Sequence, residues 1–244
     1  MATETIILLG AALFLVAMLY STVGHAGASG YIAAMTLFGM NVAQIRPTAL
    51  VLNIFVAAVT AFQFWRAGHF SFRLFFPFAL ISVPLAYLGG YVNVPVSLWQ
   101  FVLGIVLILS AIRFFLNPGE AESVQKPGLM TASLTGGSIG LLSGFTGTGG
   151  GIFLTPVMLL MRWAKTKETA AVSAMFILVN SMAGLAGNFT ATKNFPSMAY
   201  AFLGCTIAGG MVGSFLGSTH FSARWIKRLL AVVLSIAGVK LMFW

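Results

Sequence analysis

Two glycine-rich stretches hold the residues of this sequence whose types and spacing best suit ligand binding. The first reads "GHAGASG" over positions 24–30, and the second reads "GFTGTGGG" over positions 144–151. A short apolar segment follows each stretch, so we expect a helix to begin where the glycines end. A helix N-terminus offers unpaired N–H groups and a partial positive charge, and glycine lets the backbone approach a ligand closely. Two such N-termini could hold an anion without a buried basic side chain.

Polar side chains lie between these glycines and could supply further hydrogen-bond donors. Together with the glycines they make a set of candidate substrate-binding residues: Gly24, His25, Gly27, Ser29, Gly30, Thr146, Gly147, Thr148, Gly149, Gly150 and Gly151. The alternative is that the glycines only allow helices to pack closely, as small residues do between membrane helices. Close packing is what we expect of Gly209, Gly213 and Gly217, which are spaced by four residues.

Asn53 and Asn180 complete the candidate substrate-binding set. Each lies inside a long apolar segment, where an amide is unfavourable unless it faces protein or water. The sequence leaves open whether they bind a ligand or form interhelical hydrogen bonds. Arg46 either attracts anions or extends its side chain toward the membrane surface. His25 could bind an anion when protonated, shuttle a proton, or stay neutral and bonded to backbone.

The acidic residues argue against catalysis and against cation binding. The chain has no Asp and only four Glu, at positions 4, 120, 122 and 168, all at a chain end or in a connection. No carboxylate pair and no Cys/His cluster is present, so we expect neither an enzyme nor a metal site or cofactor. A Ser or Thr nucleophile would need a base, for which His25 is the only candidate. The single cysteine, Cys205, excludes an intrachain disulfide.

The composition indicates an integral membrane protein. Hydrophobic residues make up 59% of the 244 positions and charged residues only 7%, where a soluble domain has roughly 25% charged residues. The net charge of +9 comes from basic residues in small groups between apolar runs, which is the pattern of membrane topology and not of nucleic-acid binding. The expected partners are the lipid bilayer and a small anion. Homo-oligomerisation remains open.

Ten apolar segments are expected to form helices. Eight of them are near the ~20 residues that a spanning helix needs: 4–23, 47–66, 73–92, 96–116, 128–145, 169–190, 196–217 and 223–244. Two are too short to span alone, at 30–40 and 150–163, and each follows a glycine-rich stretch.

The chain reads as two related halves. Gly24, Gly27 and Gly30 align with Gly144, Gly147 and Gly150, and Thr48 aligns with Thr169 further on. A polar connection, "NPGEAESVQKP", separates them. The predicted organisation is therefore a first membrane repeat at 1–116, a linker at 117–127 and a second repeat at 128–244.

The basic residues indicate how the halves are oriented. If the two short segments cross the membrane, the main basic groups share one side, in the connections 66–73, 113–127, 162–168 and 218–228. Only Arg46 and Lys193 then lie in loops opposite. If the short segments re-enter instead, the basic groups of the second half lie on the opposite side of the membrane from those of the first half. This contradicts the usual bias of Lys and Arg toward one side. The charges thus favour an all-α polytopic fold of two inverted repeats with about five segments each, an organisation typical of secondary transporters.

The second half resembles a known family. "GFTGTGGGIFLTPVMLL" followed by "KETAAVSAMFILVNSMAGLAGNF" is similar to the TauE/SafE family of sulfite and organosulfonate exporters. This resemblance implies transport of a small sulfur-containing oxyanion, such as sulfite, sulfoacetate or a related organosulfonate, across a bacterial cytoplasmic (inner) membrane. The family has glycines where this chain has His25, Ala26, Ala28 and Ser29, so the individual substrate does not transfer.

The main hypothesis is therefore an alternating-access transporter that holds its anion between two half-helix N-termini near the midplane. A passive anion channel of the same architecture and a membrane assembly protein remain alternatives. An intramembrane enzyme is disfavoured because no nucleophile and base pair is evident. The sequence does not indicate the direction of transport or the coupling ion.

Overall fold

Helices are the only regular elements among the residues that the computed structural model describes, which are 3–92, 97–117, 119–120, 122–192 and 198–243. Its α-helices are α1 (Thr3–Thr22), α2 (Ala28–Leu37), α3 (Val42–Arg66), α4 (Phe72–Tyr91), α5 (Ser97–Leu116), α6 (Leu129–Thr146), α7 (Gly151–Leu160), α8 (Thr166–Thr192), α9 (Ala199–Phe215) and α10 (Ala223–Phe243). A π-helical turn, η1 (Leu216–His220), follows α9. The all-α prediction is confirmed, while Lys193 lies outside the described residues.

Five helices are long and apolar enough to cross a membrane, within the described part of the chain. They comprise Glu4–Thr22, Ala43–Arg66, Phe72–Tyr91, Thr166–Phe189 and Ala199–His220. The expected spans in α6 and α10 are not among them. Ten of the 18 residues of α6 are glycine, serine or threonine, and α10 carries four basic residues.

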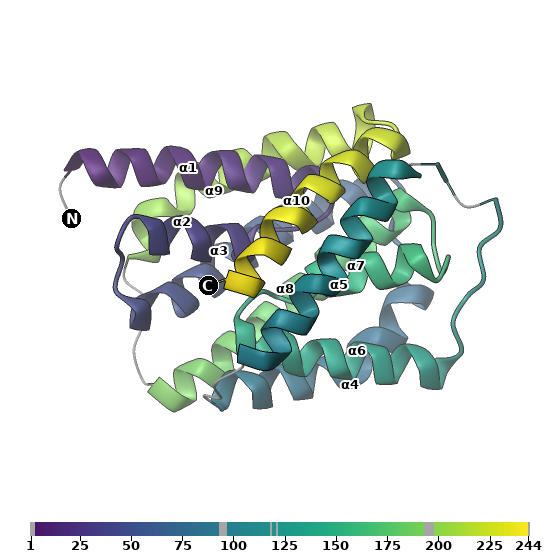
Figure 1. Ribbon diagram of the computed structural model, residues 1–244, viewed down its shortest axis with the longest axis horizontal. Helices are drawn as coiled ribbons and strands as arrows, with labels where there is room; N and C mark the ends of the chain where they lie inside the picture. Colours follow the sequence, from purple (N-terminus) through teal and green to yellow (C-terminus); the bar gives the residue numbers. More distant parts are fainter. Residues whose placement is uncertain (1–2, 93–96, 118, 121, 193–197, 244) are drawn as a thin grey trace.

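The two short helices return the chain across the molecule. α1 runs parallel to α9, because Phe14 lies against Gly209 and Thr22 against Gly217. α3 runs in the same direction as α1 (Figure 1), so α2 and the residues before it must lead back to the side where α1 begins. α6 and α8 likewise both run parallel to α4, and α7 returns the chain between them.

α3 and α8 lie antiparallel at the centre of the molecule. Leu50 lies near Gly184, and Asn53 bonds to Ser181. Outside them, α4 packs against α6 and α8, α9 packs against α1 and α3, and α5 packs against α10. Helices α1 and α9 therefore form one edge of the molecule in Figure 1, and α4 and α6 form the opposite edge.

Glycines set the spacing of the outer helix pairs. A Cβ at Gly209, Gly213 or Gly217 would lie 2.3, 2.0 or 2.0 Å from a carbonyl oxygen of α1. The packing role predicted for these three glycines is confirmed. Helix α6 uses Gly136 and Gly140 in the same way against α4.

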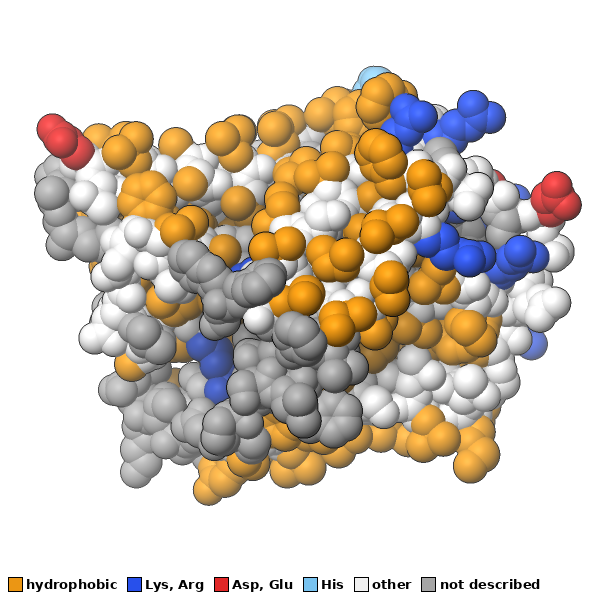
Figure 2. Space-filling model, viewed as in Figure 1, with side chains coloured by type: hydrophobic (Ala, Val, Ile, Leu, Met, Phe, Trp, Pro, Cys, Tyr) orange, Lys and Arg blue, Asp and Glu red, His pale blue; other side chains and the backbone are white. Residues whose placement is uncertain are grey.

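The outer surface is largely apolar on the face that Figure 2 shows. Across the molecule, exposed side chains such as Leu15, Phe72, Leu109 and Met130 suit contact with lipid tails. The Lys and Arg side chains on this face gather mainly at the end where the linker lies. The chain therefore presents a hydrophobic belt with one basic end, as expected for an integral membrane protein.

Candidate functional site

Two non-helical turns interrupt the helices where the glycines predicted. The first break, residues 23–27, separates α1 from α2, and the second break, residues 147–150, separates α6 from α7. Backbone φ is +106° at Gly27 and +80° at Gly150, the residues immediately before α2 and α7. Only glycine adopts this conformation readily, which explains why glycine stands at both positions. The short helices begin at Ala28 and Gly151, within two residues of the expected starts.

Asn53 joins the two breaks from the middle of α3. Its Oδ1 accepts a hydrogen bond from the N–H of Ala28, 3.1 Å away, at the first residue of α2. Its Nδ2 donates to the Ser181 hydroxyl of α8 at 3.0 Å and approaches the Thr148 carbonyl in the second break at 3.4 Å. The amide is fully buried. One side chain thus contacts the N-terminus of one half-helix and the backbone that precedes the other.

His25 makes a second connection between the halves. It belongs to the first break, and its Nε2 lies 2.8 Å from the Thr155 hydroxyl of α7. Thr155 in turn donates to the Ser173 hydroxyl of α8 at 2.7 Å. The imidazole is 2% exposed. Sequence reasoning did not single out Thr155, although a hydroxyl in the short helix after a glycine break was a usable signal.

Gly149 fits against the Asn53 network because it has no side chain. A Cβ there would lie 2.6 Å from Asn53 Nδ2 and 2.7 Å from Ser181 Oγ. Thr146 and Thr148 flank Gly147, and their hydroxyls lie 2.8 Å apart. The second break is therefore packed onto polar atoms of α3 and α8.

The other predicted glycines contact a variety of neighbours. A Cβ at Gly24 would lie 2.4 Å from the carbonyl of Ala170, and one at Gly27 would meet the Tyr31 ring. Gly30 lies inside α2 against Val16, and Gly150 and Gly151 face side chains of α8. Gly30 and Gly151 are thus helical residues, and close approach to protein atoms accounts for the glycines at Gly24, Gly27 and Gly30.

Each break has a cation beside it. The Arg46 guanidinium donates to the carbonyl oxygens of Gly89 at 3.1 Å and Gly90 at 3.2 Å, and to that of Gly144. Its stem also lies against Gly147. Arg46 therefore turns inward to the C-terminal ends of α4 and α6, where carbonyl groups favour a positive charge.

Lys240 is the cation beside the first break, and sequence reasoning missed it. Its Nζ donates to the carbonyl of Ser29, in the first turn of α2, at 3.1 Å. The Ser29 hydroxyl itself donates to Tyr20 at 3.1 Å. Lys240 lies near the end of α10, where a lysine is expected to extend toward the membrane surface, so no sequence pattern indicated a contact with the first break.

Asn180 lies apart from this network. Its Oδ1 accepts from the Ser82 hydroxyl of α4 at 2.6 Å, and its Nδ2 donates to the Phe176 carbonyl one turn earlier at 2.8 Å. These bonds are of the interhelical kind that the sequence left open. Asn180 therefore joins α8 to α4, whereas its neighbour Ser181 faces α3.

Buried hydroxyls without a partner surround the breaks. Ser143 Oγ and Thr169 Oγ1 have no hydrogen-bond partner within the described structure. Ser143 lies beside Gly150, and Thr169 is adjacent to Ala170, against which Gly24 packs. Buried polar atoms are usually paired, so each of these hydroxyls could bond to a ligand.

The acidic residues stay away from the site. Glu120 accepts hydrogen bonds from Thr166, the first residue of α8, and Glu120 and Glu168 both line a pocket at that end of α8. Across the residues that the structure describes, no group of three or more His, Cys, Asp or Glu side chains could hold a metal ion. The site thus combines neutral donors and two nearby cations.

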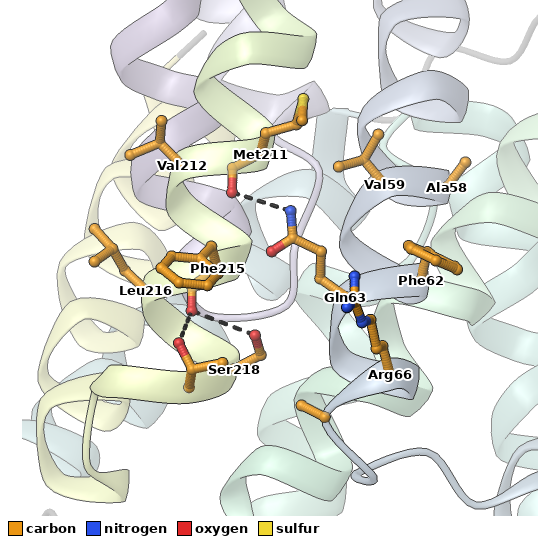
Figure 3. Close-up of a pocket in the computed structure, with 12 residues that line it drawn as sticks. Ala58, Val59, Phe62, Gln63, Arg66, Met211, Val212, Phe215, Leu216 and Ser218 are labelled. Atoms are coloured by element: carbon orange, nitrogen blue, oxygen red, sulfur yellow. Dashed lines mark hydrogen bonds between the residues drawn. The ribbon is translucent and has the colours of Figure 1, made fainter.

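A large groove lies elsewhere, between α3 and α9. It has a volume of about 1060 Å³ and is lined by Ala58, Val59, Phe62, Gln63, Arg66, Ala67, Met211, Val212, Phe215, Leu216, Ser218 and Thr219. Figure 3 shows Gln63 spanning it, with a hydrogen bond from Nε2 to the Met211 carbonyl at 3.1 Å. None of the predicted site residues lines this groove.

Helical spans, two half-length helices after glycine breaks, and a buried polar network between the breaks define a polytopic α-helical membrane protein of the transporter type. Residues 9–241 match the family model described as "Sulfite exporter TauE/SafE", and the chain belongs to this family.

Its relatives share this length and class. The chain is 40% identical over 240 residues to "Probable membrane transporter protein y4hK" of Sinorhizobium fredii (strain NBRC 101917 / NGR234), covering 96% of this chain and 97% of that protein. It is 25% identical to "Probable membrane transporter protein YdhB" of Bacillus subtilis (strain 168), covering 95% of this chain and 98% of that protein. No solved structure matches the chain.

Proposed function

We propose that this protein is a secondary transporter of a small sulfur-containing oxyanion, bound where the two breaks meet. The observation that carries the proposal is the buried Asn53 amide, which bonds to Ala28 at the start of one half-helix and to Thr148 before the other. A ligand bound there would contact both halves of the chain at once. Alternating access requires such a shared site, because the halves must move around it.

The charges near the site favour an anion. Arg46 and Lys240 each place a positive charge beside one break. Of the Glu residues, Glu4 and Glu168 lie in the first turns of α1 and α8, and Glu120 and Glu122 lie in the linker, all away from the breaks. Helix N-termini at Ala28 and Gly151 add partial positive charge. A bound cation would have no carboxylate to neutralise it within these breaks, whereas an oxyanion would meet donors on several sides.

The helix packing supports an inverted repeat, which is part of the proposal. When α1–α5 are placed on α6–α10, the contact of α4 with α6 corresponds to that of α9 with α1. The contact of α4 with α8 corresponds to that of α9 with α3. The same placement exchanges α3 with α8 and α5 with α10, so the α3–α8 contact and the α5–α10 contact are each placed on themselves. Five helices with a reversed direction in the second half would give this pattern.

The sulfur chemistry rests on the family description, and the bacterial cytoplasmic membrane rests on the organisms of the relatives. The residues themselves support a small oxyanion. Ser29 and Thr148 are hydroxyl donors in or next to the breaks, and they would bind the oxygens of a sulfite or sulfonate group.

Transport by purified protein in liposomes would test the proposal. We expect saturable uptake of labelled sulfite or sulfoacetate, and faster uptake when the liposomes already contain the unlabelled anion. Such counterflow requires a carrier, and an anion channel would not produce it. Binding of sodium or potassium ions with no binding of either sulfur anion would contradict the proposed function.

A further inference from the structure

The groove between α3 and α9 has the shape and surface of a site for a lipid chain. Its walls are Val59 and Phe62 on α3 and Met211, Val212 and Phe215 on α9. Four of these side chains are strongly exposed: Phe62 54%, Met211 51%, Val212 44% and Phe215 52%. Figure 3 shows α3 and α9 on the two sides of the groove, with Met211 and Gln63 in the space between them. An apolar groove of this size in a membrane protein would be filled by hydrocarbon.

The groove covers about one leaflet of a bilayer. It extends along α3 from Ala58 to Arg66, the last residue of that helix. Eight residues of α-helix rise ~12 Å, close to half of the ~30 Å hydrocarbon core. Its basic end therefore lies at headgroup depth, and its inner end lies near the bilayer centre.

The charged and hydroxyl groups of the groove lie at its headgroup end, and Gln63 crosses the groove about one helical turn further in. Arg66, Ser218 and Thr219 line that end, and Figure 3 shows the Arg66 guanidinium turned back along α3 toward Gln63. Lys167, in the first turn of α8, and His69, in the loop before α4, both bond to the Ser218 carbonyl. No acidic residue is among the described groove residues, although Glu168 lines the adjacent loop pocket together with Lys165 and Lys167. The headgroup end of the groove therefore carries a net positive charge.

We propose that this groove is a binding site for an anionic phospholipid, with one acyl chain between α3 and α9 and the phosphate at Arg66. The guanidinium would donate to phosphate oxygens, and Thr219 would add a hydroxyl donor. Basic pockets between membrane helices recognise anionic headgroups in this way. The site is separate from the two breaks, so the proposal does not depend on the transported substrate.

Nanodiscs of phosphatidylcholine with and without phosphatidylglycerol would test it. We expect phosphatidylglycerol to co-purify with the protein and to raise its melting temperature. Arg66→Gln should lower phosphatidylglycerol retention about fivefold, the effect of one basic residue at an anionic surface. Arg73→Gln is the matched control, because Arg73 carries the same charge in the first turn of α4 and does not line the groove.

A second variant tests the acyl chain. Val59→Trp fills the groove without changing the charge, and it should reduce retention of both lipids. Equal retention by the wild type and the Arg66→Gln variant would overturn the proposal, as would equal losses in the Arg66→Gln and Arg73→Gln variants. Displacement of the lipid by sulfite, or a dimer that buries the groove and excludes phosphatidylglycerol, would also overturn it.

Discussion

The two central helices differ in how closely their outer neighbours approach. Helix α8 is packed tightly on α4: a Cβ at Gly187 would lie 2.1 Å from the Tyr87 carbonyl, and one at Gly90 would lie 2.3 Å from the Gly184 carbonyl. Helix α3 and its neighbour α9 instead diverge around the 1060 Å³ groove. One interface is held by backbone contact, and the other is spanned by Gln63.

Residue size at two positions explains this difference. The alignment that places Thr48 on Thr169 also places Gln63 on Gly184 and Arg66 on Gly187. Glycine lets the backbones of α8 and α4 touch, whereas Gln63 and Arg66 keep α9 away from α3. Under the proposed inverted repeat, corresponding segments would form one closed and one open interface, and the proposed alternating access needs an open interface at one end of the molecule at a time.

The largest effect should come from Gly187→Ala. The added methyl group would meet backbone of α4, which cannot move aside as a side chain can, and overpacking of this kind costs about 1–3 kcal/mol. Gly184→Ala is the matched control, because its nearest neighbours lie 3.8 Å or more from the new Cβ. Melting temperatures in detergent should fall for the first variant and stay close to wild type for the second. Equal melting temperatures would mean that backbone contact does not hold this interface.

Asn53→Ala should have the next largest effect. It removes three hydrogen-bond contacts and leaves Ser181 and the Ala28 N–H unpaired in the protein interior, which costs about 1–3 kcal/mol. Under the proposed function it should also abolish anion binding. Asn180→Ala should destabilise the protein while anion affinity remains, because Asn180 bonds to α4 and to its own helix. Loss of anion binding in both variants would mean that Asn53 on α3 and Asn180 on α8 do not differ in their role in binding.

Much of the fold could be predicted from the sequence because glycine and apolar length are local signals. Composition predicted the helical class, and the glycines predicted short helices that begin at Ala28 and Gly151. That the short segments cross the membrane, which the loop charges favour, stays a prediction. Helices α6 and α10 are less apolar than the sequence segments indicated, because α6 is rich in glycine, serine and threonine and α10 carries four basic residues.

The site was predictable only in part. The positions of the breaks, and Asn53 beside them, follow from residue type. The partners of these residues do not, because Thr155, Ser181 and Lys240 reach the breaks from helices far away in the sequence. Single-sequence patterns contain no information on which side chains of α7, α8 and α10 meet. Arg46 shows the same limit, since neither of its expected roles included the carbonyl ends of α4 and α6.

Lys240→Met tests whether a positive charge beside the first break contributes more to anion affinity than a positive charge elsewhere on α10. Losing one charge-assisted contact to a bound anion costs about 1.5 kcal/mol, or about tenfold in affinity. Lys227→Met is the control, because Lys227 donates to the Gly119 carbonyl at the linker. Sulfite titrations should show weaker binding for the Lys240 variant alone. If both variants bind like the wild type, Lys240 has a structural role and the first break does not depend on it.

The smallest effect is expected from Gln63→Ala, at the open interface. The variant removes one hydrogen bond, from Gln63 to the Met211 carbonyl, on an exposed part of the structure. Such a bond contributes about 0.5–1.5 kcal/mol, and membrane hydrogen bonds average near the low end, about 0.6 kcal/mol. The melting temperature should therefore change far less than in the Gly187→Ala variant. A larger fall in melting temperature would mean that the Gln63 hydrogen bond holds α3 and α9 together. The interface around the groove would then not be an open one.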